Sequence, residues 1–149
     1  MKLTLEQMVG QRILLAFQGK DHIPPDFKRA IKKYKPAGIT FFRSLNIDNP
    51  QQVQKLTAEL QATAREAGLP LLLIAVDQEG GQLMTIGNGT TPLPGNMALG
   101  ATGDQKLARR AGEVLGRELA AMGINIDYAP CCDVNINPEN PVVGLRSFG

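Results

Sequence analysis

Residues 71–83, LLLIAVDQEGGQL, contain the feature that decides the fold of this chain. An apolar run, Leu71–Val76, is followed at once by two acids, Asp77 and Glu79, and then by Gly80–Gly81. A short continuous apolar run is typical of a strand that is covered on both faces, as strands of parallel sheets are. The two glycines predict a sharp turn directly after it. We therefore expect a buried strand whose carboxyl end carries two carboxylates.

Similar apolar runs alternate with helical patterns along the chain. The other expected strands are Ile13–Phe17, Gly38–Phe42 and Ile124–Ala129. Apolar residues recur at helical spacing over 27–34, 50–67 and 104–122, which predicts three helices. Asn49 and Pro50 mark the start of the second one, as an N-cap followed by proline at the first helical position. This alternation predicts an α/β fold in which right-handed crossovers join parallel strands.

Two architectures have this order of elements, an open doubly wound sheet and a (β/α)8 barrel. A whole barrel needs about 250 residues, and this chain has 149. The final stretch, 135–149, is irregular and rich in Asn and Pro, and compact domains rarely end on such a loop. We therefore expect residues 1–149 to form one unit, the N-terminal half of a TIM-barrel-like domain, cut inside a larger fold.

The composition argues against several classes of function. The chain is 43% apolar and 20% charged, which is typical of a globular protein, and its net charge of +2 comes without a dense basic run that would bind nucleic acid. No apolar run approaches the roughly 20 residues of a membrane span, and the first residues do not form a secretory signal. The adjacent Cys131 and Cys132 favour neither a disulfide nor a zinc site, so we expect a reducing, cytoplasmic location.

Polar residues near the carboxyl ends of the expected strands are the candidates for function, because parallel α/β folds bind their ligands at that edge. They are Arg43, Asp77, Gln78, Glu79, Asp127, Asp133, Asn135 and Arg146. Asp77 has two interpretations: a carboxylate that binds substrate hydroxyls or does acid/base work, and a turn residue bonded to nearby backbone N–H groups. Arg146 either binds a substrate oxygen or pairs with an acid, and Asp133 either fixes its loop or belongs to the site.

Other motifs argue against further chemistry. The only histidine, His22, lies in a polar loop, so no Ser-His-Asp or Cys-His arrangement is expected at the strand ends. The scattered glycines form neither a dinucleotide fingerprint nor a phosphate-binding loop. We expect no cofactor and no metal. Gly80–Gly81 indicates a tight backbone path or the close approach of a ligand, and the alternative is an ordinary pair of turn glycines.

Three motifs in order carry a resemblance to a known family: VDQEGGQL at 76–83, LPGNMALGAT at 93–102, and LAAMGINIDYAPCCDVNINPENPVVGLRSFG at 119–149. They resemble glycoside hydrolase family 3, and within it the bacterial β-N-acetylhexosaminidase branch. The resemblance implies a barrel enzyme of cell-wall recycling that hydrolyses terminal β-linked sugars, N-acetylglucosamine above all, with retention. It also implies that Asp77 and Arg146 bind the terminal sugar, which suits charge-assisted hydrogen bonds to its hydroxyls.

The same resemblance places the residues that cut the bond beyond this chain. The family's Lys-His pair, its His acid/base and its Asp nucleophile all lie further along, so we expect the 149 residues alone to be inactive. Asp77 and Glu79 sit on one turn and would not straddle a glycosidic bond, so Glu79 is expected to form the turn or support the site. Gln82 and Thr85 stand where the hexosaminidase branch has arginines, the second of them sugar-binding.

Two other hypotheses follow from the residues. A non-catalytic half barrel would bind sugar, or associate with a second copy through its unpaired strand edges. A doubly wound small-molecule binder would need a glycine-rich phosphate turn after the first strand, and 18–20, QGK, does not supply one.

Overall fold

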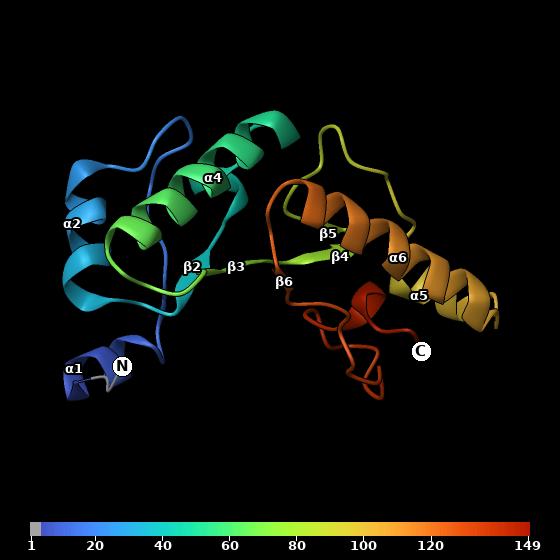
Figure 1. Cartoon of the computed structure of the whole chain (residues 1–149). Helices are drawn as coiled ribbons and strands as arrows, with labels where there is room; N and C mark the ends of the chain where they lie inside the picture. Colours follow the sequence, from blue (N-terminus) through green and yellow to red (C-terminus); the bar gives the residue numbers. More distant parts are fainter. Residues whose placement is uncertain (1–3) are drawn as a thin grey trace.

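The computed structural model describes residues 4–149 and contains a four-stranded parallel sheet in the order β1-β2-β3-β6 (Figure 1). Ile39 of β2 pairs with Ile74 of β3, and Val76 of β3 pairs with Asp127 of β6. All four expected strands are present, each shorter than its apolar run. Their bounds are Leu14–Leu15 for β1, Gly38–Thr40 for β2, Leu73–Val76 for β3 and Ile126–Asp127 for β6.

The three expected helices join these strands as crossovers: α2 (Pro25–Tyr34), α4 (Pro50–Glu66) and α6 (Gln105–Ala121). The strand order follows the chain order, so right-handed crossovers place all three helices on the same side of the sheet. A doubly wound sheet needs a point where the strand order reverses, and this sheet has none within residues 4–149. The topology is therefore that of part of a (β/α)8 barrel, with α2 and α4 packed side by side (Figure 1).

Several short elements were not predicted from the sequence. The turn predicted from the glycine pair is present at 81–82, a few residues later than directly after Val76. It belongs to a small antiparallel hairpin with an irregular register, which the sequence did not predict. Short helices also precede β1, follow β2 and follow the hairpin. The bounds are β4 Gln78–Gly80, β5 Leu83–Met84, α1 Leu5–Gly10, α3 Arg43–Asn46, α5 Asn96–Ala101 and a 3₁₀ turn, η1, at Gly144–Arg146.

The core that fixes the sheet lies between β2, β3 and the helices α2 and α4. Ile39, Ile74, Val53 and Leu60 have no exposed surface, and burial of each such side chain contributes about 1.5–3 kcal/mol. Val76 is also fully buried. The strand that leads into Asp77 is therefore held rigidly up to the residue before the carboxylate.

Helix α4 begins with Asn49 as its N-cap, as the sequence predicted. The Asn49 side chain accepts a hydrogen bond of 2.9 Å from the Gln52 backbone N–H. Asn49→Ala removes this cap and is expected to lower the free energy of unfolding by about 1 kcal/mol. Urea unfolding of the chain measures it, with the exposed neighbour Gln51→Ala as the control. Equal effects of the two changes would contradict a capping role for Asn49.

Candidate functional site

Two carboxylates leave neighbouring strands at the same edge of the sheet. Asp77 directly follows β3, and Asp127 is the last residue of β6, opposite Val76. The Gln78 backbone N–H donates a hydrogen bond of 2.9 Å to Asp127 Oδ1. The sheet therefore brings both acids to one edge, as expected of parallel strands.

Asp77 is half-buried, and its backbone carbonyl accepts a hydrogen bond of 3.2 Å from the Thr85 N–H. Within residues 4–149 the Asp77 carboxylate itself accepts no hydrogen bond, although its neighbours Gln78 and Glu79 are both bonded. A turn-forming Asp would bond to a nearby backbone N–H group. The Asp77 carboxylate does not form such a bond within the described residues, so its acceptor capacity is unused there.

Arg146 and Glu79 form a two-point ion pair. Arg146 Nε lies 2.9 Å from Glu79 Oε2, and Arg146 Nη2 lies 2.6 Å from Glu79 Oε1. The Glu79 side chain is only 3% exposed and that of Arg146 28%. Such parallel charge-assisted bonds fix the guanidinium plane, and the hydrogen bonds to Glu79 raise the pKa of Arg146 above its usual value. Of the two interpretations of Arg146, pairing with an acid is therefore realised.

The ion pair does not use all of the Arg146 donors. A guanidinium has five N–H groups; two bind Glu79 and one binds the Val142 carbonyl at 3.3 Å. The other two N–H groups have no partner within residues 4–149. The Arg146 backbone is held as well, because Asn96 Nδ2 donates to its carbonyl at 2.8 Å.

The glycine pair has its close neighbour inside the protein. Gly80 and Gly81 both have positive φ, 91° and 57°, which favours glycine. A Cβ on Gly81 would lie 2.9 Å from the Cα of Gly95. The pair follows a tight backbone path close to the segment before α5, and Gly81 also lies in the turn of the hairpin.

Gln78 anchors the hairpin that follows Asp77. Its side chain is 1% exposed and forms two bonds of 2.9 Å with the Ile86 backbone, one to the carbonyl and one from the N–H. The sequence placed Gln78 among the strand-end residues but gave no sign of this role. Its backbone N–H serves Asp127 at the same time.

Asp127 lies beside a pocket of about 300 Å³ that Glu79 also lines. Most of the other lining residues are apolar, among them Leu99, Leu115 and Phe148. Burial raises the pKa of Asp127 to about 6; the Gln78 N–H opposes the rise, and the charges of Asp77 and Glu79 add to it. A larger apolar hollow of about 480 Å³ lies between α1 and the end of α2 and contains none of these groups.

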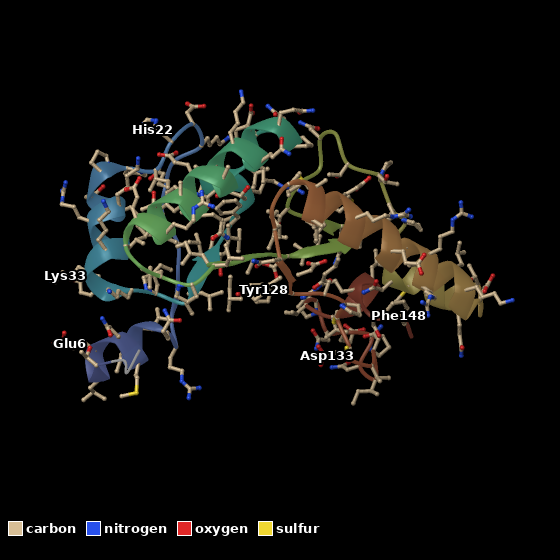
Figure 2. All side chains as sticks on the ribbon, in the orientation of Figure 1. Glu6, His22, Lys33, Tyr128, Asp133 and Phe148 are labelled. Carbon is tan, nitrogen blue, oxygen red and sulfur yellow. The ribbon has the colours of Figure 1, made fainter. Side chains whose placement is uncertain are left out.

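Two of the remaining candidates, Arg43 and Asp133, have structural partners, whereas the side-chain oxygen of Asn135 is buried without a hydrogen-bond partner within residues 4–149. Arg43 donates to the Met84 carbonyl. Asp133 fixes its loop, because Oδ2 accepts from Cys131 Sγ at 3.4 Å and its carbonyl accepts from Ser147 Oγ at 2.6 Å. His22 lies on the loop before α2, far from Asp133 (Figure 2).

Two findings concern other kinds of site. In the part of the chain that the structure describes, no three His, Cys, Asp or Glu side chains are grouped so as to hold a metal ion. None of the helices within residues 4–149 is long and apolar enough to cross a membrane.

Comparison with known proteins gives a consistent result. The family described as "Glycosyl hydrolase family 3 N terminal domain" matches residues 4–149. Beta-hexosaminidase A of Pseudoalteromonas piscicida is 36% identical over 98% of this chain and 28% of its own length. The beta-hexosaminidase of Neisseria meningitidis (strain MC58) is 38% identical over 74% of this chain and 31% of its own.

Solved structures agree. The family 3 β-N-acetylglucosaminidase of Paenibacillus sp. FPU-7 is 48% identical with a TM-score of 0.94, covering 99% of this chain and 28% of that one. The β-N-acetylhexosaminidase of Beutenbergia cavernae is 30% identical with a TM-score of 0.82, covering 99% and 46%. The chain thus spans less than half the length of each of these four proteins. On this evidence the chain belongs to glycoside hydrolase family 3, and it forms part of that family's N-terminal barrel.

Proposed function

We propose that this chain supplies part of the sugar-binding wall of a retaining β-N-acetylglucosaminidase. One observation carries the proposal: Asp77 lies at the end of a rigid central strand, and its carboxylate accepts no hydrogen bond from any group of residues 4–149. The similar proteins named above are β-hexosaminidases and β-N-acetylglucosaminidases, which supports a terminal N-acetylglucosamine as the substrate group. We propose cell-wall recycling as the role of the whole enzyme.

The chemistry of the wall is that of positioning. The Asp77 carboxylate accepts hydrogen bonds from sugar hydroxyls, and the two N–H groups of Arg146 that have no partner within residues 4–149 donate to sugar oxygens. Groups held this firmly place the anomeric carbon for attack, and their bonds strengthen as the ring distorts toward an oxocarbenium-like state. Glu79 keeps the guanidinium in place and is not itself free to react.

The nucleophile and the acid/base come from outside this chain. Retaining hydrolysis needs two such groups on opposite sides of the scissile bond. Glu79 is engaged by Arg146, and Asp127 is bonded to the amide directly after Asp77, so these acids form one wall. We place the protein in the cytoplasm, a location that the two unpaired cysteines suit.

The experiment uses what we call the assembled enzyme: residues 4–149 joined to the part of the Paenibacillus enzyme that follows the matched segment. We expect it to release nitrophenol from p-nitrophenyl β-N-acetylglucosaminide, while the 149-residue chain alone gives no turnover. Turnover by the chain alone would contradict the proposal that the nucleophile and the acid/base lie outside it. A folded assembled enzyme that prefers the β-glucoside would contradict N-acetylglucosamine as the substrate sugar.

A second candidate function is a non-catalytic, sugar-binding half barrel that associates with another copy of itself. The outer strands β1 and β6 each have a single neighbour in the sheet, and the apolar hollow beside α1 is open to a partner. Sedimentation equilibrium of the chain decides it. A stable dimer that binds N-acetylglucosamine would favour this alternative, and a monomer would exclude it.

A further inference from the structure

Of the three carboxylates at the carboxyl ends of β3 and β6, Asp127 alone has no specific role in the proposed function; Asp77 binds the sugar and Glu79 holds Arg146. It is half-buried next to Asp77 and Glu79, and its only hydrogen bond within residues 4–149 is the one from the Gln78 amide. A carboxylate kept in such a place costs free energy, since burial disfavours its charge. The arrangement therefore calls for a role that a neutral apolar residue would not fill.

We propose that Asp127 is a positioning residue for Asp77: it accepts the Gln78 amide hydrogen and so fixes the direction in which the Asp77 carboxylate leaves the end of β3. The inference rests on the proposed sugar-binding role of Asp77 and adds a residue to that site.

The geometry concerns a single peptide unit. The Asp77 carbonyl and the Gln78 N–H belong to the same planar group, so fixing both ends fixes its plane. The carbonyl end accepts from the Thr85 N–H at 3.2 Å, and the amide end donates to Asp127 Oδ1 at 2.9 Å. Thr85 is itself held, because the next residue, Ile86, is bonded twice to the Gln78 side chain. Without Asp127 only the carbonyl end would stay tied.

The charges around Asp127 make this positioning depend on pH. The ionisable groups that face it are Asp77 and Glu79, and Glu79 is neutralised by Arg146. An ionised carboxylate accepts an N–H bond more strongly than a neutral one. Burial raises the pKa of Asp127 from 3.8 to about 6. Below about that pH the hydrogen bond from the Gln78 N–H to Asp127 is therefore weaker.

The free energy of unfolding depends on pH in the opposite direction to the strength of the Gln78–Asp127 hydrogen bond. Between pH 3.8 and about 6 the folded chain holds the Asp127 proton more tightly than the unfolded chain does. The free energy of unfolding therefore falls as the pH rises through this range. Asp127→Asn keeps an oxygen acceptor and has no proton to lose, so it is expected to remove this dependence.

The test compares Asp127→Ala and Asp127→Asn in the assembled enzyme, with kcat and KM measured from pH 4.5 to 8. We expect Asp127→Ala to lower kcat/KM by about 10–100-fold, because a small misplacement of a binding group costs about that much. Asp127→Asn is expected to stay within about threefold at pH 7 and to lose any inflection near pH 6. Wild-type kcat/KM in Asp127→Ala, or equal losses in both variants with the fold intact, would overturn the proposal.

A second readout is independent of activity. In the wild-type chain we expect the Gln78 amide proton resonance to shift with a midpoint near pH 6, and in Asp127→Asn to stay constant. Asp21→Asn, in an exposed loop, is the control. If the Gln78 resonance of the wild type did not change with pH, the proposed positioning role of Asp127 would be contradicted even if the enzyme is active. Inactive wild-type enzyme with the expected shift would instead count against the proposed function alone.

Discussion

Asp77→Ala is expected to lower kcat/KM of the assembled enzyme about 10²–10³-fold. The carboxylate accepts no hydrogen bond within residues 4–149, so its removal is expected to take hydrogen bonds from the sugar and none from these residues. Stability should change little, because the side chain is half-buried and has no partner within residues 4–149. Steady-state kinetics on p-nitrophenyl β-N-acetylglucosaminide and urea unfolding measure the two effects side by side.

Two variants sharpen the Asp77 result. Asp77→Asn keeps the shape and loses the charge, so we expect an intermediate loss of kcat/KM. Asp21→Ala, an exposed acid in the loop before α2, should leave kcat/KM unchanged. An Asp77→Ala enzyme within about threefold of the wild type would show that the sugar is held by other groups.

Arg146→Ala is expected to lower the free energy of unfolding of the chain by about 2–4 kcal/mol, since it leaves the buried Glu79 carboxylate without its cationic partner. Glu79 is 3% exposed and receives two of its bonds from this one side chain. Arg146→Ala should also lower kcat/KM of the assembled enzyme, because we propose that its remaining N–H groups donate to the sugar. The double change Glu79→Gln with Arg146→Ala should cost less stability than the sum of the single changes.

An exposed ion pair on α6 is the matched control. Arg109 and Glu113 lie 3.0 Å apart with side chains 82% and 53% exposed, so Arg109→Ala should change stability by less than about 0.5 kcal/mol. Urea unfolding of the variants gives the comparison. If Arg146→Ala destabilised no more than Arg109→Ala, the Glu79 pair would have no structural importance.

The sheet and its crossovers were predictable because short continuous apolar runs alternate with segments of clear helical spacing. The pattern of α4, with its cap at Asn49, gave the element within a few residues of its bounds. The hairpin of β4 and β5 was not predictable, because it depends on Gln78 reaching Ile86 through a buried side chain. The helices α1, α3 and α5 are too short to show a period.

The site was predictable in its location and less so in its partners. Asp77 was recognisable as a strand-end acid, and its sugar-binding role stays a prediction. The pairing of Glu79 with Arg146 joins residues 67 apart along the chain, and nothing local in the sequence signals it. The expected strand, Ile124–Ala129, contained Asp127, but the sequence did not show that β6 ends at this residue. The raised pKa of Asp127 follows from burial that only the folded chain defines.

A crystal structure of the assembled enzyme with N-acetylglucosamine tests the central claim most directly. We expect an Asp77 carboxylate oxygen within hydrogen-bond distance of a ring hydroxyl, about 2.6–3.0 Å, with the Glu79–Arg146 pair still formed beneath the sugar. A sugar bound at the barrel mouth without contact to Asp77 would contradict the account.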